Sequence, residues 1–116
     1  MRLDYRNPTG RLGPPVFFDD AGRPCPMPYH QRIRITNLDT GRELTHCIYA
    51  DDLTGDWERY VPGVDGRLHY SFLKKGVPTE AGQSRLAIEF LDLRGVPVAL
   101  PKGVRRDSTQ RPSAHV

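Results

Sequence analysis

The stretch Tyr49–Phe72 reads YADDLTGDWERYVPGVDGRLHYSF and decides the fold class. It places two turn-like clusters, DDLTGD and PGVDG, between short runs of aromatic and branched residues. Asp and Gly tolerate the left-handed torsions that tight hairpin turns need, and aromatic and branched residues favour a half-buried sheet face. The stretch therefore predicts antiparallel hairpins.

The same alternation of apolar and polar residues continues on both sides of this stretch. Period-two patterns between Asp/Gly turns indicate strands, and short connections favour a meander in which neighbouring strands pair. We expect KKGVPTEAGQ, by contrast, to be a longer polar loop. The predicted strands, with the residues aligned on one face, are QRIRITNL (Ile33, Ile35), ELTHCIYA (Leu44, His46, Ile48), WERYV (Trp57, Val61) and RLHYSFL (Leu68, Tyr70, Phe72).

The segment SRLAIEFLDL fits two structures. As a strand it aligns Leu86, Ile88 and Phe90, and as a short helix it brings Leu86, Phe90 and Leu93 near one side. The β-rich surroundings and the following RGVP turn favour the strand. We expect VPVAL to pair with it, with its proline at a sheet edge.

The 116 residues predict one small all-β domain with two extensions. Residues 1–29 hold six of the eleven prolines, so we expect an extended N-terminal arm that docks through Phe17 and Phe18. Residues 30–100 form the β-core, an antiparallel meander that closes as a barrel or packs as a two-layer sandwich, because its apolar face must be covered. Residues 101–116 form a flexible basic tail.

The net charge of +3 is not spread evenly. The tail 101–116 carries four basic residues against Asp107, which is +3, so residues 1–100 sum to zero. No apolar run is long enough for a membrane helix, and the start MRLDYRNPTG lacks the apolar middle of a signal peptide. We therefore expect a cytosolic location, in which Cys25 and Cys47 need no disulfide.

Metal-ligating residue types occur without a metal-binding pattern. Of Cys25, His30, His46, Cys47 and His69, the adjacent His46 and Cys47 point to opposite faces of a strand, so they cannot easily share a zinc ion. Between Leu44 and Ile48, His46 is expected to be a packed core histidine. Asp51, Asp52 and Asp56 lack the ligand order of an EF-hand loop, so no metal site is predicted.

Catalytic patterns are also missing. His69 and Ser71 would lie on one strand face, roughly 7 Å apart at the backbone, with no nucleophile elbow. The sequence contains no P-loop, dinucleotide-binding glycine pattern or His-Glu-x-x-His motif. We expect no enzymatic activity, no cofactor and no small-molecule substrate.

Nucleic-acid binding remains an alternative. Four arginines occupy polar-face positions of predicted strands: Arg32, Arg34, Arg67 and Arg85. The aromatic residues that could stack on bases are Tyr49, Trp57 and Tyr60. Small barrels bind single strands with such a combination. The candidate nucleic-acid contacts are Arg32, Arg34, Lys102, Arg105 and Arg106.

The run TGRELTHCIYADDLTGDWERYVPGVDGR resembles short uncharacterised proteins of tailed bacteriophages and prophages, through its TG turn, YAD strand end and DG turn. The resemblance covers roughly residues 32–68. It implies a virion, assembly or host-interaction role, with a phage or host protein or a second copy as partner, in the host cytoplasm or the virion. Because aromatic residues and arginine dominate interface energetics, the candidate protein contacts are Tyr49, Trp57, Arg59 and Tyr60.

Overall fold

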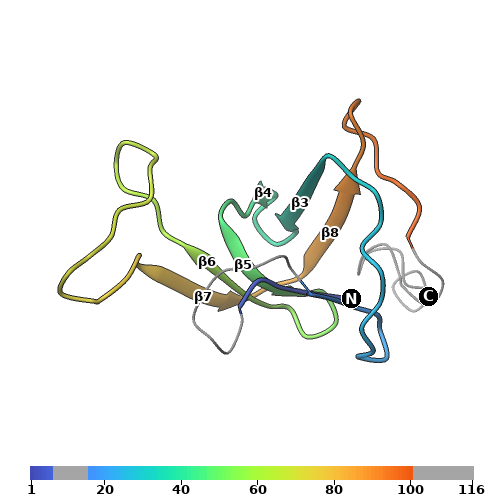
Figure 1. Cartoon of the computed structure of the whole chain (residues 1–116), viewed down its shortest axis with the longest axis horizontal. Helices are drawn as coiled ribbons and strands as arrows, with labels where there is room; N and C mark the ends of the chain where they lie inside the picture. Colours follow the sequence, from blue (N-terminus) through green and yellow to red (C-terminus); the bar gives the residue numbers. More distant parts are fainter. Residues whose placement is uncertain (7–15, 101–116) are drawn as a thin grey trace.

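The computed structural model describes residues 1–6 and 16–100, and these residues form two antiparallel sheets without a helix (Figure 1). The all-β prediction is thus confirmed for the described residues. The strands are β1 (Arg2–Asp4), β2 (Val16–Phe18), β3 (Arg32–Asn37), β4 (Arg42–Glu43), β5 (Cys47–Asp51), β6 (Asp56–Tyr60), β7 (Thr79–Gln83) and β8 (Leu86–Leu91).

The larger sheet has the order β2-β1-β5-β6-β7. The start of the chain lies inside this sheet, because β1 pairs with β2 on one side and with β5 on the other: Leu3 lies opposite both Phe17 and Ala50. A register shift between Cys47 and Tyr49 interrupts the β5–β6 pairing. Such a bulge bends a strand locally.

The smaller sheet has the order β4-β3-β8. β3 and β8 pair over six residues each, from Arg32 opposite Leu91 to Asn37 opposite Leu86. The strand interpretation of SRLAIEFLDL is therefore confirmed. VPVAL forms no further strand, but it adds a bridge between Leu91 and Pro97 and two backbone hydrogen bonds: the Val98 amide donates to the Phe90 carbonyl, and the Val96 carbonyl accepts from the Asp92 amide.

The core lies between the two sheets, and both contribute to it. Phe17 of β2 meets Phe90 of β8 edge to face, with ring centroids 5.1 Å apart. Burying each large apolar side chain stabilises the fold by about 1.5–3 kcal/mol. The buried cluster comprises Met1, Leu3, Phe17, Ile35, Ala50, Leu86, Ile88 and Phe90.

Two packed sheets agree with the predicted sandwich, whereas the predicted closed barrel is wrong. The five-stranded sheet ends at β2 and β7, and the three-stranded sheet ends at β4 and β8, so among residues 1–6 and 16–100 no ladder joins the sheets into a cylinder. The simple meander is also wrong in part, because β1 pairs with β5 and β3 pairs with β8, far apart in sequence.

Three local predictions are wrong, one of them because glycine and proline outweigh alternation. RLHYSFL forms no strand, and Tyr70 and Phe72 are exposed rather than buried, because Pro62, Gly63, Gly66, Gly76 and Pro78 bend the chain around it. TEAGQ, expected in a loop, is strand β7, held by five pairs with β6.

The third failure concerns His46, which is exposed and has a φ of 59° instead of packing in the core. β5 begins only after it, at Cys47, so the face expected to join Leu44, His46 and Ile48 is broken at that residue. Ile48 is buried as expected.

Candidate functional site

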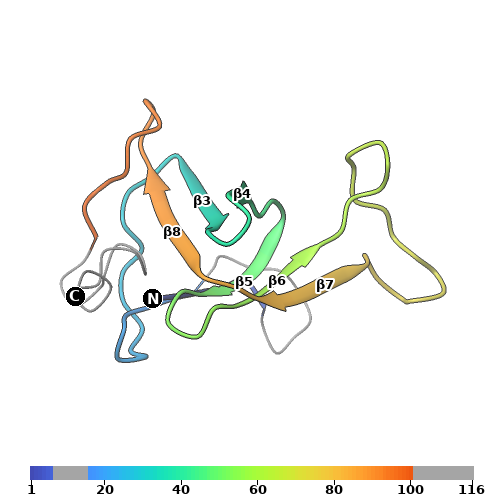
Figure 2. The same ribbon diagram turned by 180° about the vertical axis from the view of Figure 1, so that it is seen from behind.

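Residues 61–78 leave the sandwich between β6 and β7 and project from it, and we call this segment the finger (Figures 1 and 2). Its base is closed by the hydrogen bond from the Val61 amide to the Pro78 carbonyl, 2.8 Å long. Further out, Ser71 and Gly76 exchange two backbone hydrogen bonds of 2.7 and 3.1 Å. The tip between them is thus a defined turn.

The finger exposes large apolar side chains, although contact of such side chains with water is unfavourable. At the tip, Phe72 is 88% exposed and Leu73 97% exposed. Tyr70 stacks on Phe72 edge to face, with ring centroids 5.1 Å apart, and Val64 projects from the neighbouring turn. Exposed apolar groups gathered in one place mark interaction surfaces.

The finger and the rest of the described chain carry opposite charge. Residues 61–78 hold Arg67, Lys74 and Lys75 against Asp65, which is +2 in side-chain charge. In residues 1–6, 16–60 and 79–100, nine arginines face twelve Asp and Glu residues, which is −3. His69 contacts Asp65 at 2.9 Å and this hydrogen bond lowers the pKa of Asp65, so the one acid of the finger is engaged within it.

A groove of about 440 Å³ opens beside the core, near the base of the finger. Burial raises the pKa of the Cys47 thiol in it to about 11 and also raises the pKa of the Tyr5 hydroxyl. Both groups are therefore neutral near pH 7, and the groove is apolar over most of its wall. It is lined by Tyr5, Ile33, Ile35, Glu43, Leu44, Thr45, His46, Cys47, Ile48, Tyr60 and Leu68.

The four predicted protein contacts do not share one surface. Tyr49 and Trp57 line a shallow cavity of about 330 Å³ together with Arg6, whose guanidinium lies 4.0 Å from the centre of the Tyr49 ring. Tyr60 lies instead in the groove wall.

Two of these four residues have structural partners. The indole of Trp57 lies on Gly82, where a Cβ would come within 2.5 Å of the ring, so a glycine is needed there. Arg59 donates to the Thr45 carbonyl at 2.9 Å and to Glu80 at 2.7 Å, and its side chain is only 16% exposed. The exposed aromatic residues of the described chain are Tyr70 and Phe72 of the finger and Tyr29, which stands outside it.

Among the predicted nucleic-acid contacts, the two described residues are ion-paired. Arg32 donates to Glu43 at 2.6 Å, and Arg34 donates to Glu89 at 2.8 and 3.0 Å. Lys102, Arg105 and Arg106 lie outside the described residues. Of the basic groups of the finger, which flank Tyr70 and Phe72, Arg67 was considered for nucleic-acid binding, whereas Lys74 and Lys75 were not.

Within residues 1–6 and 16–100, no three His, Cys, Asp or Glu side chains lie close enough together to hold a metal ion. Cys25 and Cys47 are both free thiols. His30 Nδ1 lies 2.7 Å from the Pro28 carbonyl oxygen, and Asp51 accepts the Leu53 amide at 2.9 Å.

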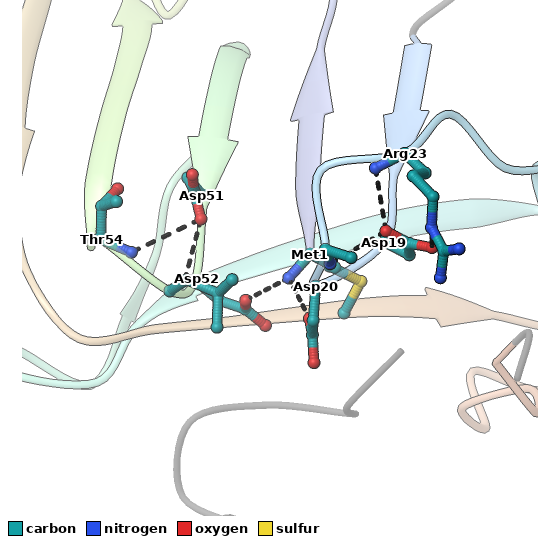
Figure 3. A network of polar contacts seen from close by, with 9 residues as sticks. Met1, Asp19, Asp20, Arg23, Asp51, Asp52 and Thr54 are labelled. Carbon is teal, nitrogen blue, oxygen red and sulfur yellow. Dashed lines mark hydrogen bonds and ion pairs between the residues drawn. The ribbon is translucent and has the colours of Figure 1, made fainter. Parts of the chain in front are cut away.

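The α-amino group of Met1 forms the centre of a buried polar network (Figure 3). Its nitrogen lies 2.6 Å from Oδ1 of Asp52 and 2.7 Å from Oδ1 of Asp20. Burial alone lowers the pKa of this amine, but the hydrogen bonds and charges of the two carboxylates outweigh burial and raise it. The amine is therefore a cation at neutral pH that fastens β1 to the turns after β2 and β5.

Comparison with protein-family models, with curated proteins and with solved structures finds no match to this chain. Within its described part, the chain contains no helix with the length and apolar character needed to cross a membrane. The case for function therefore depends on the surfaces described above and on the motif resemblance.

Proposed function

We propose that this protein is a non-enzymatic structural or accessory protein of a bacteriophage or prophage, and that it acts through protein–protein contacts made by the finger. The observation that carries the proposal is the tip of the finger, where an ordered turn holds Phe72 and Leu73 almost fully in solvent. Burying such side chains in a partner is favourable at about 25 cal/mol per Å² of apolar surface.

The rigidity of the turn supports this function. A flexible loop loses conformational entropy when it binds a partner. A tip that hydrogen bonds already hold in one conformation loses less conformational entropy. The phage assignment has a separate basis, the TG, YAD and DG motifs of residues 40–67, and the genes next to this one test it. Adjacent capsid, tail or recombination genes support the phage origin, and metabolic neighbours contradict it.

Site-specific photo-crosslinking in the host tests the contact function. A photoreactive amino acid at Phe72 is expected to yield a discrete adduct with one protein, identified by mass spectrometry. The same amino acid at Leu93, which is 83% exposed on the loop after β8, is the matched control and is expected to give none. Equal labelling from both positions, or no adduct from Phe72, contradicts the proposal.

A second candidate function, binding of single-stranded nucleic acid, is favoured by the basic groups of the same finger. Arg67, Lys74 and Lys75 accompany Tyr70 and Phe72, and stacking rings combined with cations suit single strands. Salt-dependent retention on single-stranded DNA that persists without residues 101–116 and is lost in Lys74→Glu/Lys75→Glu supports this alternative. Retention that disappears with the tail alone contradicts it.

A further inference from the structure

We propose that the partner of the finger is a second copy of this chain, whose groove receives the tip side chains Phe72 and Leu73. This inference rests on the proposed contact function and names its partner. Both halves of the contact are present on one molecule: an apolar projection and an apolar groove, each open to solvent.

The tip does not fill the groove of its own chain. Leu68, at the base of the finger, lines that groove, whereas Phe72 and Leu73 remain 88% and 97% exposed. The finger therefore leads away from its own groove, and a tip in contact with a groove belongs to another copy. Two copies that exchange tips around a twofold axis form a closed dimer, in which each tip occupies the groove of the other copy.

The size and chemistry of the groove suit these side chains. Its volume of about 440 Å³ falls within the roughly 300–1,000 Å³ of ligand pockets. Ile33, Leu44 and Ile48 provide apolar wall, and the Cys47 thiol and Tyr5 hydroxyl are neutral there. An aromatic ring and a leucine side chain match such a lining better than a charged ligand does.

The charges favour the same pairing. The finger carries +2 and the remainder of the described chain −3 in side-chain charge, so each finger is attracted to the other body. Lys74 and Lys75 follow the apolar tip directly, whereas Glu43 in the groove wall is already ion-paired with Arg32. The attraction therefore comes from the net charge of the body and orients the approach, while the apolar contact supplies the affinity.

Sedimentation of the full chain across a concentration series tests the dimer. We expect the wild type to sediment as a dimer, and the double variant Phe72→Asp/Leu73→Asp to dimerise at least about 30-fold more weakly. Leu93→Asp is the matched control, an equally exposed apolar residue outside the finger, and is expected to remain dimeric. Circular dichroism checks that all three keep the same fold.

The position of the tip is tested by paramagnetic broadening between copies. A nitroxide is attached to Lys74→Cys in a Cys25→Ser background at pH 7, where the buried Cys47 thiol reacts slowly. Mixed with an isotope-labelled copy, it is expected to broaden the amides of Ile33, Leu44 and Ile48. Broadening confined to other surfaces overturns the groove assignment.

A wild type that is monomeric at every concentration overturns the inference, as does a dimer that the double variant leaves intact. A monomer retained by single-stranded DNA through the finger overturns it in favour of nucleic acid. The failure of this inference can be distinguished from failure of the proposed contact function. If the chain does not dimerise but Phe72 crosslinks to a different protein, the contact function stands and only the dimer is overturned. If Phe72 gives no adduct, the contact function itself is overturned.

Discussion

The α-amino nitrogen of Met1 lies 2.6 Å from the Asp52 carboxylate, and both groups are withdrawn from solvent in the folded chain. Asp20 completes the site at 2.7 Å, from the turn after β2 (Figure 3). A buried ion pair gains little over an apolar contact of the same shape, but removing one partner leaves an uncompensated charge. The link between the chain start and the β5–β6 turn is therefore sensitive to any change at either end.

Asp52→Asn is expected to lower the free energy of unfolding by about 1.5–3 kcal/mol, because the Met1 ammonium loses a buried, charge-assisted hydrogen bond while Asp20 still neutralises it. Urea unfolding followed by circular dichroism measures the change. Asp56→Asn, an exposed acid at the start of β6, serves as control and should stay within about 0.5 kcal/mol of wild type. Equal stability of the two variants would show that the ion pair is not stabilising.

Stability is expected to decline in alkaline solution. The pKa of the Met1 amine is raised in the folded state, so its contribution is fully present below the unfolded pKa of about 8 and is lost as pH rises through the higher folded pKa. Thermal melts between pH 7 and 10 measure this loss. A chain with an acetylated Met1 should lack this component of the pH dependence and be less stable at pH 7.

Gly55→Ala is expected to destabilise the fold more than Gly41→Ala. Both glycines have positive φ, +82° and +74°, where a Cβ costs about 1–2 kcal/mol. At Gly55 the Cβ would also lie 2.4 Å from the Ser84 carbonyl oxygen, whereas at Gly41 no atom of the described part of the chain stands within 4 Å. The extra cost of about 1–3 kcal/mol from this clash is read from the difference in urea midpoints. Equal midpoints would contradict the close approach of the two turns.

Phe17→Ala is expected to cost about 3–5 kcal/mol, because the ring is 2% exposed and packs on Phe90. Phe18→Ala is the neighbouring comparison, since that ring lies under the Arg2 guanidinium at 3.9 Å and is only half-buried. Its loss should cost about 1 kcal/mol. A mild effect at Phe17, measured by urea unfolding, would mean that residues 16–18 are not part of the core.

The Cys47 thiol is expected to react slowly with thiol reagents at pH 8, because burial raises its pKa to about 11 and the thiolate is the reactive form. Burial also raises the pKa of Cys25, which does not line the groove and serves as the comparison. Rates followed by mass spectrometry should rise with pH for Cys47, and denaturant should make both thiols equally fast. Rapid labelling of Cys47 at pH 7 would contradict its buried setting.

The sequence predicted the strands in which the alternation of apolar and polar residues coincides with burial. It could not show which of the two sheets each strand joins. Ile35 and Ile48 are buried as their patterns indicate, and Leu86, Ile88 and Phe90 resolve the helix alternative. The pairing of β1 with β5 joins residues almost fifty positions apart, and a three-residue strand has too little pattern to reveal it.

The candidate site was harder to predict for the same reason. Period two in Leu68, Tyr70 and Phe72 is a true local pattern, yet a strand also needs a partner at hydrogen-bonding distance. The prolines and glycines on both sides were the available signal that this segment bends away, and Lys74-Lys75-Gly76 marks its tip. Exposure of an aromatic residue depends on what the rest of the chain covers, which no local pattern contains.

Beneath the finger, β6 and β7 remain joined from Asp56 opposite Gln83 to Tyr60 opposite Thr79. Their ladder is complete before the finger begins, and the entropy of closing a loop changes only slowly with its length. The segment above it can therefore be exchanged for another sequence while the sandwich is retained. Selection, or a protein engineer, can redirect this molecule toward a new target by rewriting some eighteen residues.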